Sequence, residues 1–215
     1  MIDIIQRVNH KRGIQMGHSQ ADKADSHERI VRIAAARLRE AGLDGVGVAE
    51  LMKAAGLTHG GFYRHFSSRD ELVAEAVESA LAHGEKRMTK AAGRDPQAPF
   101  CALVDSYLSP VHRDNVAESC AIVTLAGDMA RRNDRARAAY TRQVAAYLER
   151  IAHLLEPAAG PDARRRAIAA FSTLVGAVAL ARAVDDDALS LEILQAAGAT
   201  LKAGATGTGS DPAKA

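Results

Sequence analysis

Residues 48–72 read VAELMKAAGLTHGGFYRHFSSRDEL, and this stretch decides the fold. Apolar residues recur at helical spacing over 48–55, and Gly56 then offers the positive φ angle of a tight turn. Thr58 follows as the cap of a second, very short helix that reaches residue 65. Two short helices joined at a glycine turn are the geometry of a helix-turn-helix, whose second helix enters the major groove of DNA. A plain helical hairpin has the same pattern.

The second of these helices is poorly suited to a buried position. Gly60 and Gly61 in its first turn each lower helix stability by roughly 1 kcal/mol relative to alanine. Glycines at a helix N-terminus let the backbone amides approach a phosphate or a base edge closely. The short, polar, glycine-rich sequence therefore favours a helix that faces DNA over the plain hairpin.

The composition of the 215-residue chain predicts an all-α protein. The chain contains 45 alanines, the strongest helix formers, but only four phenylalanines and four tyrosines. Hydrophobic residues make up 47% and charged residues 25%, which excludes a disordered chain. The net charge of +2 is no argument for nucleic acid by itself, although the basic excess lies in residues 1–66.

The cysteines and the apolar stretches indicate a cytoplasmic protein without a membrane role. Two cysteines, Cys101 and Cys120, are too few for a disulfide framework, and the N-terminus has no signal-peptide pattern. The longest mostly apolar stretch, 167–181, is shorter than the ~20 residues that a spanning helix needs.

Helical spacing predicts about nine helices along the chain. We expect a flexible arm over 1–25, a helix-turn-helix domain over 26–70, a larger helical bundle over 71–203 and a disordered tail over 204–215. Capping residues predict helix starts at Asp25, Ser68, Asp95 and Asn115. Later helices are expected over 134–155, over 162–184, and from the acidic run 185–187 to about Gly204.

The run from Gly56 to Phe66, GLTHGGFYRHF, resembles the recognition-helix signature of the TetR/AcrR family of bacterial transcriptional repressors. The step Glu71-Leu72 and the helix pattern of the remaining chain support the resemblance. It implies a homodimer that binds a palindromic operator in double-stranded DNA. The matched positions imply phosphate contacts from Thr58, Tyr63, His65 and Arg69, and contacts to base edges or the adjoining backbone from His59, Gly60 and Arg64, with Gly61 beside them.

One of these positions departs from the family pattern. His59 stands where the family usually has lysine, which exchanges a permanent charge for a group with an unperturbed pKa of ~6.5. Phe62 and Phe66 are expected to pack in the core. For Tyr63 and His65 the alternative is a half-buried packing role.

The resemblance also implies that residues 71–203 bind a small-molecule effector and dimerise through the last two long helices. Helix 162–184 carries small residues at helical spacing, which would let a partner helix approach closely. The predicted dimer contacts are Ala169, Ser172, Thr173, Gly176 and Leu180. Ordinary packing within one chain is the alternative.

Residues 107–125 join two helices that would border the effector pocket. The candidate pocket residues are Tyr107, His112, Cys120, Tyr140 and Tyr147. A redox- or electrophile-sensing Cys120 is one alternative, although a buried cysteine is usually inert. A metal site at His112, Asp114 and Cys120 is disfavoured, because one histidine and one cysteine eight residues apart are no metal signature.

The chain shows no pattern that is typical of an enzyme. It lacks a glycine-rich phosphate loop after a strand, a nucleophile elbow and a paired metal motif, so we expect no catalysis and no cofactor. The sequence predicts a cytoplasmic, homodimeric TetR-like repressor, released by a small-molecule effector or by modification of Cys120. The alternative is a helical small-molecule or redox sensor that does not read DNA.

Overall fold

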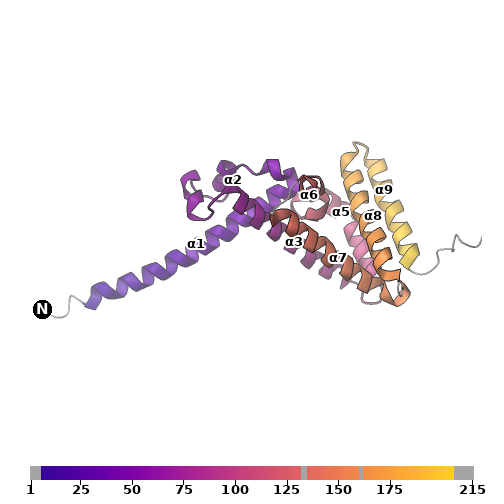
Figure 1. The fold of residues 1–215 in the computed structure, drawn as a ribbon, viewed down its shortest axis with the longest axis horizontal. Helices are drawn as coiled ribbons and strands as arrows, with labels where there is room; N and C mark the ends of the chain where they lie inside the picture. The colour runs from indigo at the N-terminus through magenta and orange to yellow at the C-terminus, as the bar shows by residue number, and fades with distance from the viewer. Residues whose placement is uncertain (1–5, 132–134, 160–161, 206–215) are drawn as a thin grey trace, which may run out of the picture.

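The computed structural model describes residues 6–131, 135–159 and 162–205. Within them the chain forms nine α-helices, three short 3-10 helices and no strand, which confirms the predicted all-α fold (Figure 1). The α-helices are α1 (Gln6–Ala41), α2 (Val48–Ala54), α3 (Arg69–Ala92), α4 (Pro99–Tyr107), α5 (Pro110–Asp114), α6 (Ala121–Ala130), α7 (Arg135–Ala159), α8 (Ala163–Ala183) and α9 (Asp187–Ala205). The 3-10 helices are η1 (Leu43–Gly45), η2 (His59–Arg64) and η3 (Val116–Glu118).

The first helix is longer than the sequence predicts. The expected start at Asp25 is wrong, because α1 begins at Gln6 and runs for 36 residues. The stretch 6–25 contains no proline, and extending a helix is far easier than nucleating one. Figure 1 shows this end of α1 projecting away from the rest of the molecule. Residues 1–5 of the predicted arm and 206–215 of the predicted tail lie outside the described residues.

The small N-terminal bundle forms around the apolar face of α1. Ile30, Ala34 and Leu38, which recur at three- and four-residue steps, are fully buried as predicted. The same core takes in side chains from α2, η2, α3 and the loop between η2 and α3, namely Leu51, Met52, Phe62, Phe66, Leu72 and Val73. Each fully buried side chain of this size stabilises the fold by about 1.5–3 kcal/mol.

Two predicted helix boundaries have the expected chemistry. Gly42 follows α1 with a φ of 67°, the left-handed conformation that glycine adopts without steric cost. At the start of α3 the Ser68 hydroxyl accepts a hydrogen bond from the amide of Glu71 at 3.1 Å. The Glu71 carboxylate reaches one residue further back than in a standard capping box, because it accepts from the amide and hydroxyl of Ser67.

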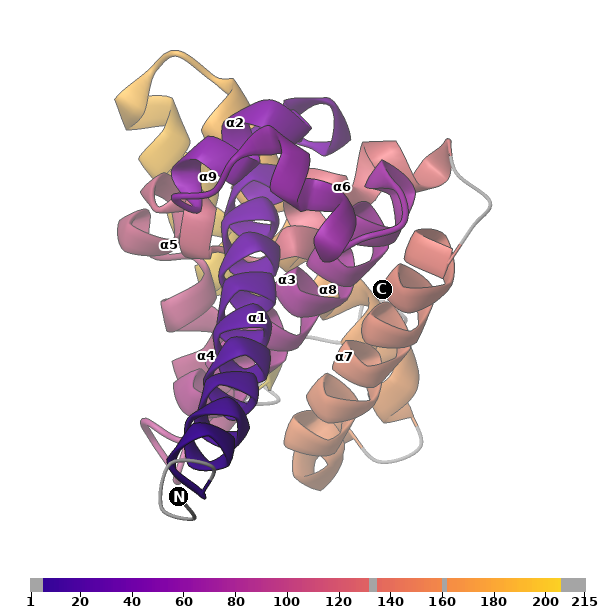
Figure 2. The same cartoon turned by 90° about the vertical axis from the view of Figure 1, so that its left-hand side faces the viewer.

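The helix α3 belongs to both bundles, since it packs on α1 at one side and on α4 and α7 at the other. Figure 2 shows α1 running in front of α3, with α7 to one side. Beyond α7 follow α8 and α9, which pack side by side at the end of the molecule farthest from Gln6 (Figure 1). Tyr147 of α7 meets Phe171 of α8 edge to face, with ring centres 5.4 Å apart.

Three predicted boundaries in the larger bundle are wrong. Asp95 closes a turn instead of starting a helix, because its carboxylate accepts from the amides of Gln97 and Ala98, and α4 begins only at Pro99. Asn115 precedes the 3-10 helix η3, and α6 starts later, at Ala121. The five-residue helix α5 was not predicted. The helix α7 runs through the proline at 157, where a break was expected, and ends two residues later.

One helix within the described ranges, α8, is long and apolar enough to cross a membrane by length and composition. Its 21 residues exceed the shorter apolar stretch that the sequence suggests. A single helix of this kind, packed between α7 and α9, is equally typical of the core of a soluble helical domain.

Candidate nucleic-acid interface and interior cavity

The segment α2–η2 has the connectivity of a helix-turn-helix. Gly56 forms the turn with a φ of 71°, and the Leu57 amide bonds back to the Met52 carbonyl at 2.8 Å. The second helix is a 3-10 helix rather than the predicted α-helix, and the Thr58 side chain makes no capping hydrogen bond. Two glycines in six residues disfavour a regular α-helical turn, whereas 3-10 geometry is common in pieces this short.

Two aromatic side chains anchor η2 to the core. Phe62 and Phe66 are 2% exposed each, with ring centres 5.5 Å apart, so their predicted packing role is confirmed. A methyl group added to Gly61 would lie 3.6 Å from the end of Met52, which is ordinary van der Waals contact. The helix is therefore fixed on one side, and its other side is free to carry function.

The outward side of η2 carries most of the residues predicted to meet DNA. Tyr63 is 74% exposed, although its ring touches the edge of Phe62 at a centre distance of 5.3 Å. A methyl group on Gly60 would meet no atom within 4 Å. The exposed residues of this group are Thr58, His59, Gly60, Tyr63 and Arg64, and Gly61 is half-buried.

His65 and Arg69 lie at the edge of this surface and are held from within. His65 is half-buried, and within the described residues its buried Nδ1 has no hydrogen-bond partner. Burial, helped by the nearby His27, lowers the pKa of His65 and keeps its ring neutral. The Arg69 guanidinium donates to the carbonyl oxygens of Val46 at 3.1 Å and Leu43 at 2.8 Å, and so ties the start of α3 to the loop before α2.

A second arginine positions the helix-turn-helix segment 48–66, which we call the reading unit. This arginine was not predicted from the sequence. Arg29 of α1 donates from Nε to the carbonyl of Ala55 at 3.0 Å, which caps the end of α2. The sequence shows Arg29 only as a polar residue off the apolar face of α1. Nothing in its spacing indicates which carbonyl it meets.

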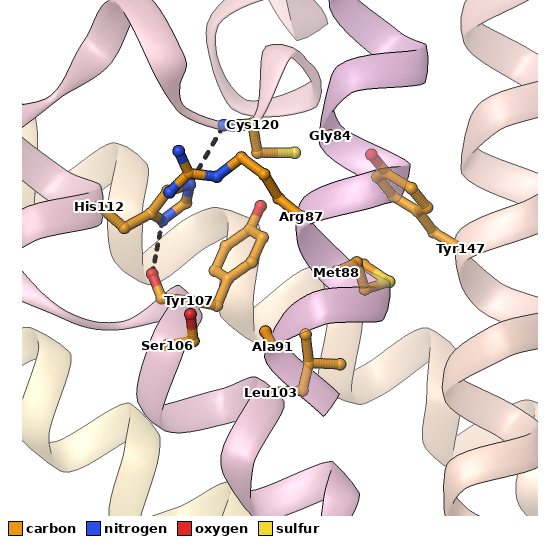
Figure 3. Close-up of a pocket in the computed structure, with 10 residues that line it drawn as sticks. All are labelled: Gly84, Arg87, Met88, Ala91, Leu103, Ser106, Tyr107, His112, Cys120 and Tyr147. Atoms are coloured by element: carbon orange, nitrogen blue, oxygen red, sulfur yellow. Dashed lines mark hydrogen bonds between the residues drawn. The ribbon is translucent and has the colours of Figure 1, made fainter. Parts of the chain in front are cut away.

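The larger bundle contains a small interior cavity of about 30 Å³, room for about one water molecule. Four of the five predicted pocket residues come together around it, and Arg87 stands among them (Figure 3). They are Tyr107, His112, Cys120 and Tyr147, and the other lining residues are Gly84, Arg87, Met88, Ala91, Leu103 and Ser106.

Tyr140, the fifth predicted pocket residue, does not line the cavity. Its hydroxyl donates to the Ile122 carbonyl at 3.0 Å, and burial raises its pKa to about 12.

His112 links two backbone groups in the cavity wall, and we call this pair of hydrogen bonds the His112 clasp. Its Nδ1 lies 2.6 Å from the Tyr107 carbonyl, and its Nε2 accepts from the Cys120 amide at 3.1 Å. Because Nε2 accepts, the proton must sit on Nδ1 and the ring is neutral. Burial lowers the pKa of His112 to about 4. Both ring nitrogens are occupied, so His112 has no lone pair for a metal, and Asp114 pairs with Arg113 instead.

Cys120 stands directly before α6 and is 5% exposed. Burial raises the pKa of its thiol, which therefore stays protonated at neutral pH. A protonated, enclosed thiol is a weak nucleophile.

The cavity wall is joined to the N-terminal bundle through polar contacts. Arg39 of α1 is buried and donates to the carbonyl of Ala117, three residues before Cys120. The amide of Leu43 donates to the Asp128 carboxylate at 3.0 Å, which connects the end of α1 to α6. The segment 107–120 is therefore in direct contact with α1.

The outer face of α8 is exposed and rich in small and apolar residues. Phe171, Leu174 and Val178 face inward and are buried. Leu180 is 59% exposed and Ile168 46% exposed on α8, and Leu189 and Leu191 are exposed on α9. The five residues predicted to contact a partner, Ala169, Ser172, Thr173, Gly176 and Leu180, are all exposed or half-buried.

Comparisons with known proteins agree with this architecture. Residues 30–76 match the family model for bacterial regulatory proteins of the tetR family. An uncharacterised HTH-type transcriptional regulator of Mycobacterium tuberculosis is 29% identical over 163 residues, which cover 72% of this chain and 83% of the relative. Another, from Bacillus subtilis, is 35% identical over 57 residues, or 26% of this chain and 29% of that protein.

The fold matches a solved structure over most of its length. A TetR transcriptional regulator from Chloroflexus aurantiacus superposes with a TM-score of 0.75 and 26% identity, over 86% of this chain and 96% of that one. The family and the fold are those of regulators rather than enzymes. The chain therefore belongs to the TetR family of transcriptional regulators and carries the helix-turn-helix DNA-binding domain of that family.

Proposed function

We propose that this regulator is a cytoplasmic repressor that binds a palindromic operator as a homodimer and is released by a small-molecule effector. The observation that carries the proposal is Tyr63, which is 74% exposed on η2, whereas the neighbouring Phe62 of the same helix is buried. A phenol held outward by a fixed helix is a hydrogen-bond donor suited to a phosphate. An exposed tyrosine in this place favours a DNA reader over a sensor that does not read DNA.

The residues around Tyr63 divide between phosphate and base contacts in this proposal. Thr58 and Tyr63 face phosphates, and His59, Gly60, Gly61 and Arg64 face base edges or the adjoining backbone. His65 and Arg69 act at the rim. Within the described residues, two carbonyl bonds occupy Nε and one terminal nitrogen of Arg69, and we assign its other terminal nitrogen to a phosphate.

The test removes one hydroxyl from the surface and one from the interior. In Tyr63→Phe the ring stays and a phosphate contact is lost, so we expect about tenfold weaker binding to a duplex from the region upstream of the gene. Fluorescence anisotropy measures this affinity. Tyr140→Phe is the control, because that hydroxyl bonds inside the protein. Wild-type affinity in Tyr63→Phe would remove Tyr63 from the interface.

We propose that α8 and α9 form the dimer interface. Leu180 and Ile168 on α8 and Leu189 and Leu191 on α9 are exposed apolar side chains. A second copy of the same two helices could cover them. Small side chains between them allow the close approach of a partner helix. A dimer of this kind must hold the two reading helices about one turn of DNA apart, ~34 Å, to match a palindrome.

Release follows from the cavity and its link to α1. A space of about 30 Å³ is too small for an organic effector, so binding must push the wall segment 107–120 outward. That segment holds Arg39 through Ala117, and a shift there would tilt the reading unit. The effector must bind the tilted form more tightly for release to occur.

Modification of Cys120 is the weaker of the two proposed release routes. A reagent would have to enter a closed interior to reach a thiol that is 5% exposed and whose pKa is raised by burial. The buried position therefore supports the small-molecule route.

A further inference from the structure

The polar end of the cavity contains a buried hydroxyl that bonds only to a thiol. Tyr107 is 7% exposed, and its hydroxyl donates to the Cys120 thiol, a weak acceptor, and within the described part of the chain it meets no oxygen or nitrogen partner. Figure 3 shows this hydroxyl pointing toward the end of the cavity where Arg87 and Cys120 lie. A buried hydroxyl that points into a cavity and bonds only to a thiol could exchange this weak contact for an oxygen acceptor on a ligand.

The same end of the cavity contains a cation without a counter-ion. Arg87 of α3 is half-buried, and among the described residues no hydrogen bond or ion pair involves its guanidinium. The cavity lining includes no aspartate or glutamate. Because Arg87 also lines the outer groove, water reaches its guanidinium, and an anionic ligand that displaced this water could pair with it.

The neighbouring groups cannot serve as that anion. His112 is neutral with both ring nitrogens engaged, and burial keeps the Cys120 thiol protonated. Arg182 adds positive charge nearby, since it donates to the carbonyls of His112 and Arg113 at 2.9 Å each. Asp95 and Asp105 line the adjoining outer groove, where Asp105 is already paired with Lys202 at 2.7 Å.

We propose that the cavity binds a small organic acid whose carboxylate is held by Arg87 and the Tyr107 hydroxyl. A guanidinium fork and a phenol donor match a planar carboxylate, and the ion pair strengthens out of water. The apolar part of the acid would pack against Met88, Leu103 and Tyr147. This inference rests on the proposed function, in which the cavity is the effector site, and it adds the chemical class of the effector.

An entry route fits this orientation. Arg87 and Ser106 also line an outer groove of about 510 Å³ between α3, α4 and α5. They stand at the border of the groove and the inner cavity. An acid that enters apolar end first would leave its carboxylate at the border, beside Arg87. The interior must widen to admit it, as the release mechanism requires.

The test compares sodium carboxylates from acetate to octanoate, and phenylacetate, each with its uncharged primary amide. Isothermal titration calorimetry on the full-length protein measures binding at neutral pH. We expect at least one carboxylate to bind about tenfold or more tightly than its amide. Arg87→Gln should abolish the difference, Arg87→Lys should keep most of it, and Tyr107→Phe should weaken the carboxylate only. Lys90→Gln, which removes a charge from the exposed face of the same helix, is the control and should bind as the wild type does.

Three results would overturn the inference: no carboxylate binds, each amide binds as well as its acid, or Arg87→Gln keeps the preference. Operator release is measured in parallel and separates this inference from the proposed function. A carboxylate that binds through Arg87 but leaves operator affinity unchanged supports the inference and contradicts the effector role of the cavity. Release by amides alone supports the effector role and overturns the inference.

Discussion

At the scale of single residues, His112 shows how one neutral ring holds a segment together. It joins the carbonyl that ends α4 to the amide that starts α6, across η3. Protonation would place a hydrogen on Nε2 and break the bond from the Cys120 amide. Arg182 and Arg87 also disfavour the charged ring. The clasp therefore depends on pH.

We predict that acid destabilises the protein partly through His112. The folded-state pKa of about 4 lies below the ordinary value of 6.5, so the unfolded chain binds the proton more tightly. The contribution is complete above about pH 6.5 and is lost as the pH falls toward 4. Between about pH 7 and pH 5 the free energy of unfolding should drop by about 2 kcal/mol through this residue. Urea denaturation across this range measures it.

The variant His112→Gln provides the comparison. Its free energy of unfolding is expected to be lower at neutral pH. It should also fall by correspondingly less on acidification, because glutamine does not titrate. The pKa values of His65 and His83 are also lowered by burial and act in the same direction. An acid response unchanged in His112→Gln would assign the effect to those two residues.

The residue scale also shows where sequence reasoning stops. Tyr107, His112, Cys120 and Tyr147 were predicted pocket residues and do meet at one cavity. Nothing in the sequence indicates that the His112 ring bonds to two backbone groups, because only the shape of the 107–120 segment brings those groups to the ring. Arg87 was missed because it is one of several polar residues on a long amphipathic helix.

At the scale of elements, the glycines of the reading unit have separable roles. Gly56 has a φ of 71° in open space, so only backbone strain opposes a side chain there. Gly60 also faces open space but has no positive φ. We predict that Gly56→Ala lowers the free energy of unfolding by about 1 kcal/mol, whereas Gly60→Ala does not lower it.

The variant that does not lower the free energy of unfolding, Gly60→Ala, is the one expected to weaken operator binding. An added methyl at Gly60 lies on the surface proposed to approach DNA, so Gly60→Ala should weaken operator binding while the protein stays fully folded. Thermal unfolding and anisotropy on the same preparations separate the effects. Equal operator affinity in Gly60→Ala and wild type would place Gly60 away from the DNA.

The buried faces of helices with a long apolar stripe were predictable. The boundaries of helices that depend on local hydrogen bonds were not. The stripes of α1, α3 and α8 indicate buried faces that the structure confirms. The capping residues Asp95 and Asn115 suggest helix starts, but the same side chains also close turns. The extent of α1 before Ser26 was missed because polar helical residues show no periodicity there.

At the scale of the whole molecule, dimerisation is the property that allows a palindrome to be read. We predict that Gly176→Leu weakens the dimer and leaves each subunit folded, because a side chain at Gly176 meets no atom of its own chain within 4 Å. Multi-angle light scattering measures the mass, and Ala126→Leu on the exposed side of α6 is the control. An unchanged dimer in Gly176→Leu would exclude this face of α8 from the interface.

The family could be predicted because the run 56–66 is short, local and specific, and the all-α architecture could be predicted from the alanine-rich composition. The partner surface and the effector could not be derived in the same way. They depend on which faces of α8 and α9 remain uncovered and on how four distant segments enclose a cavity, and neither is encoded in local spacing.

The most direct test of the central claim is a titration of the wild-type protein against a fluorescent duplex from its own upstream intergenic region. An unrelated duplex of equal length is titrated beside it, at low and moderate salt. A homodimeric operator reader is predicted to bind the duplex from the intergenic region tightly, with two chains per duplex. It should still prefer this duplex over the unrelated one when moderate salt weakens binding to both duplexes. Weak and equal binding to both duplexes would contradict the claim.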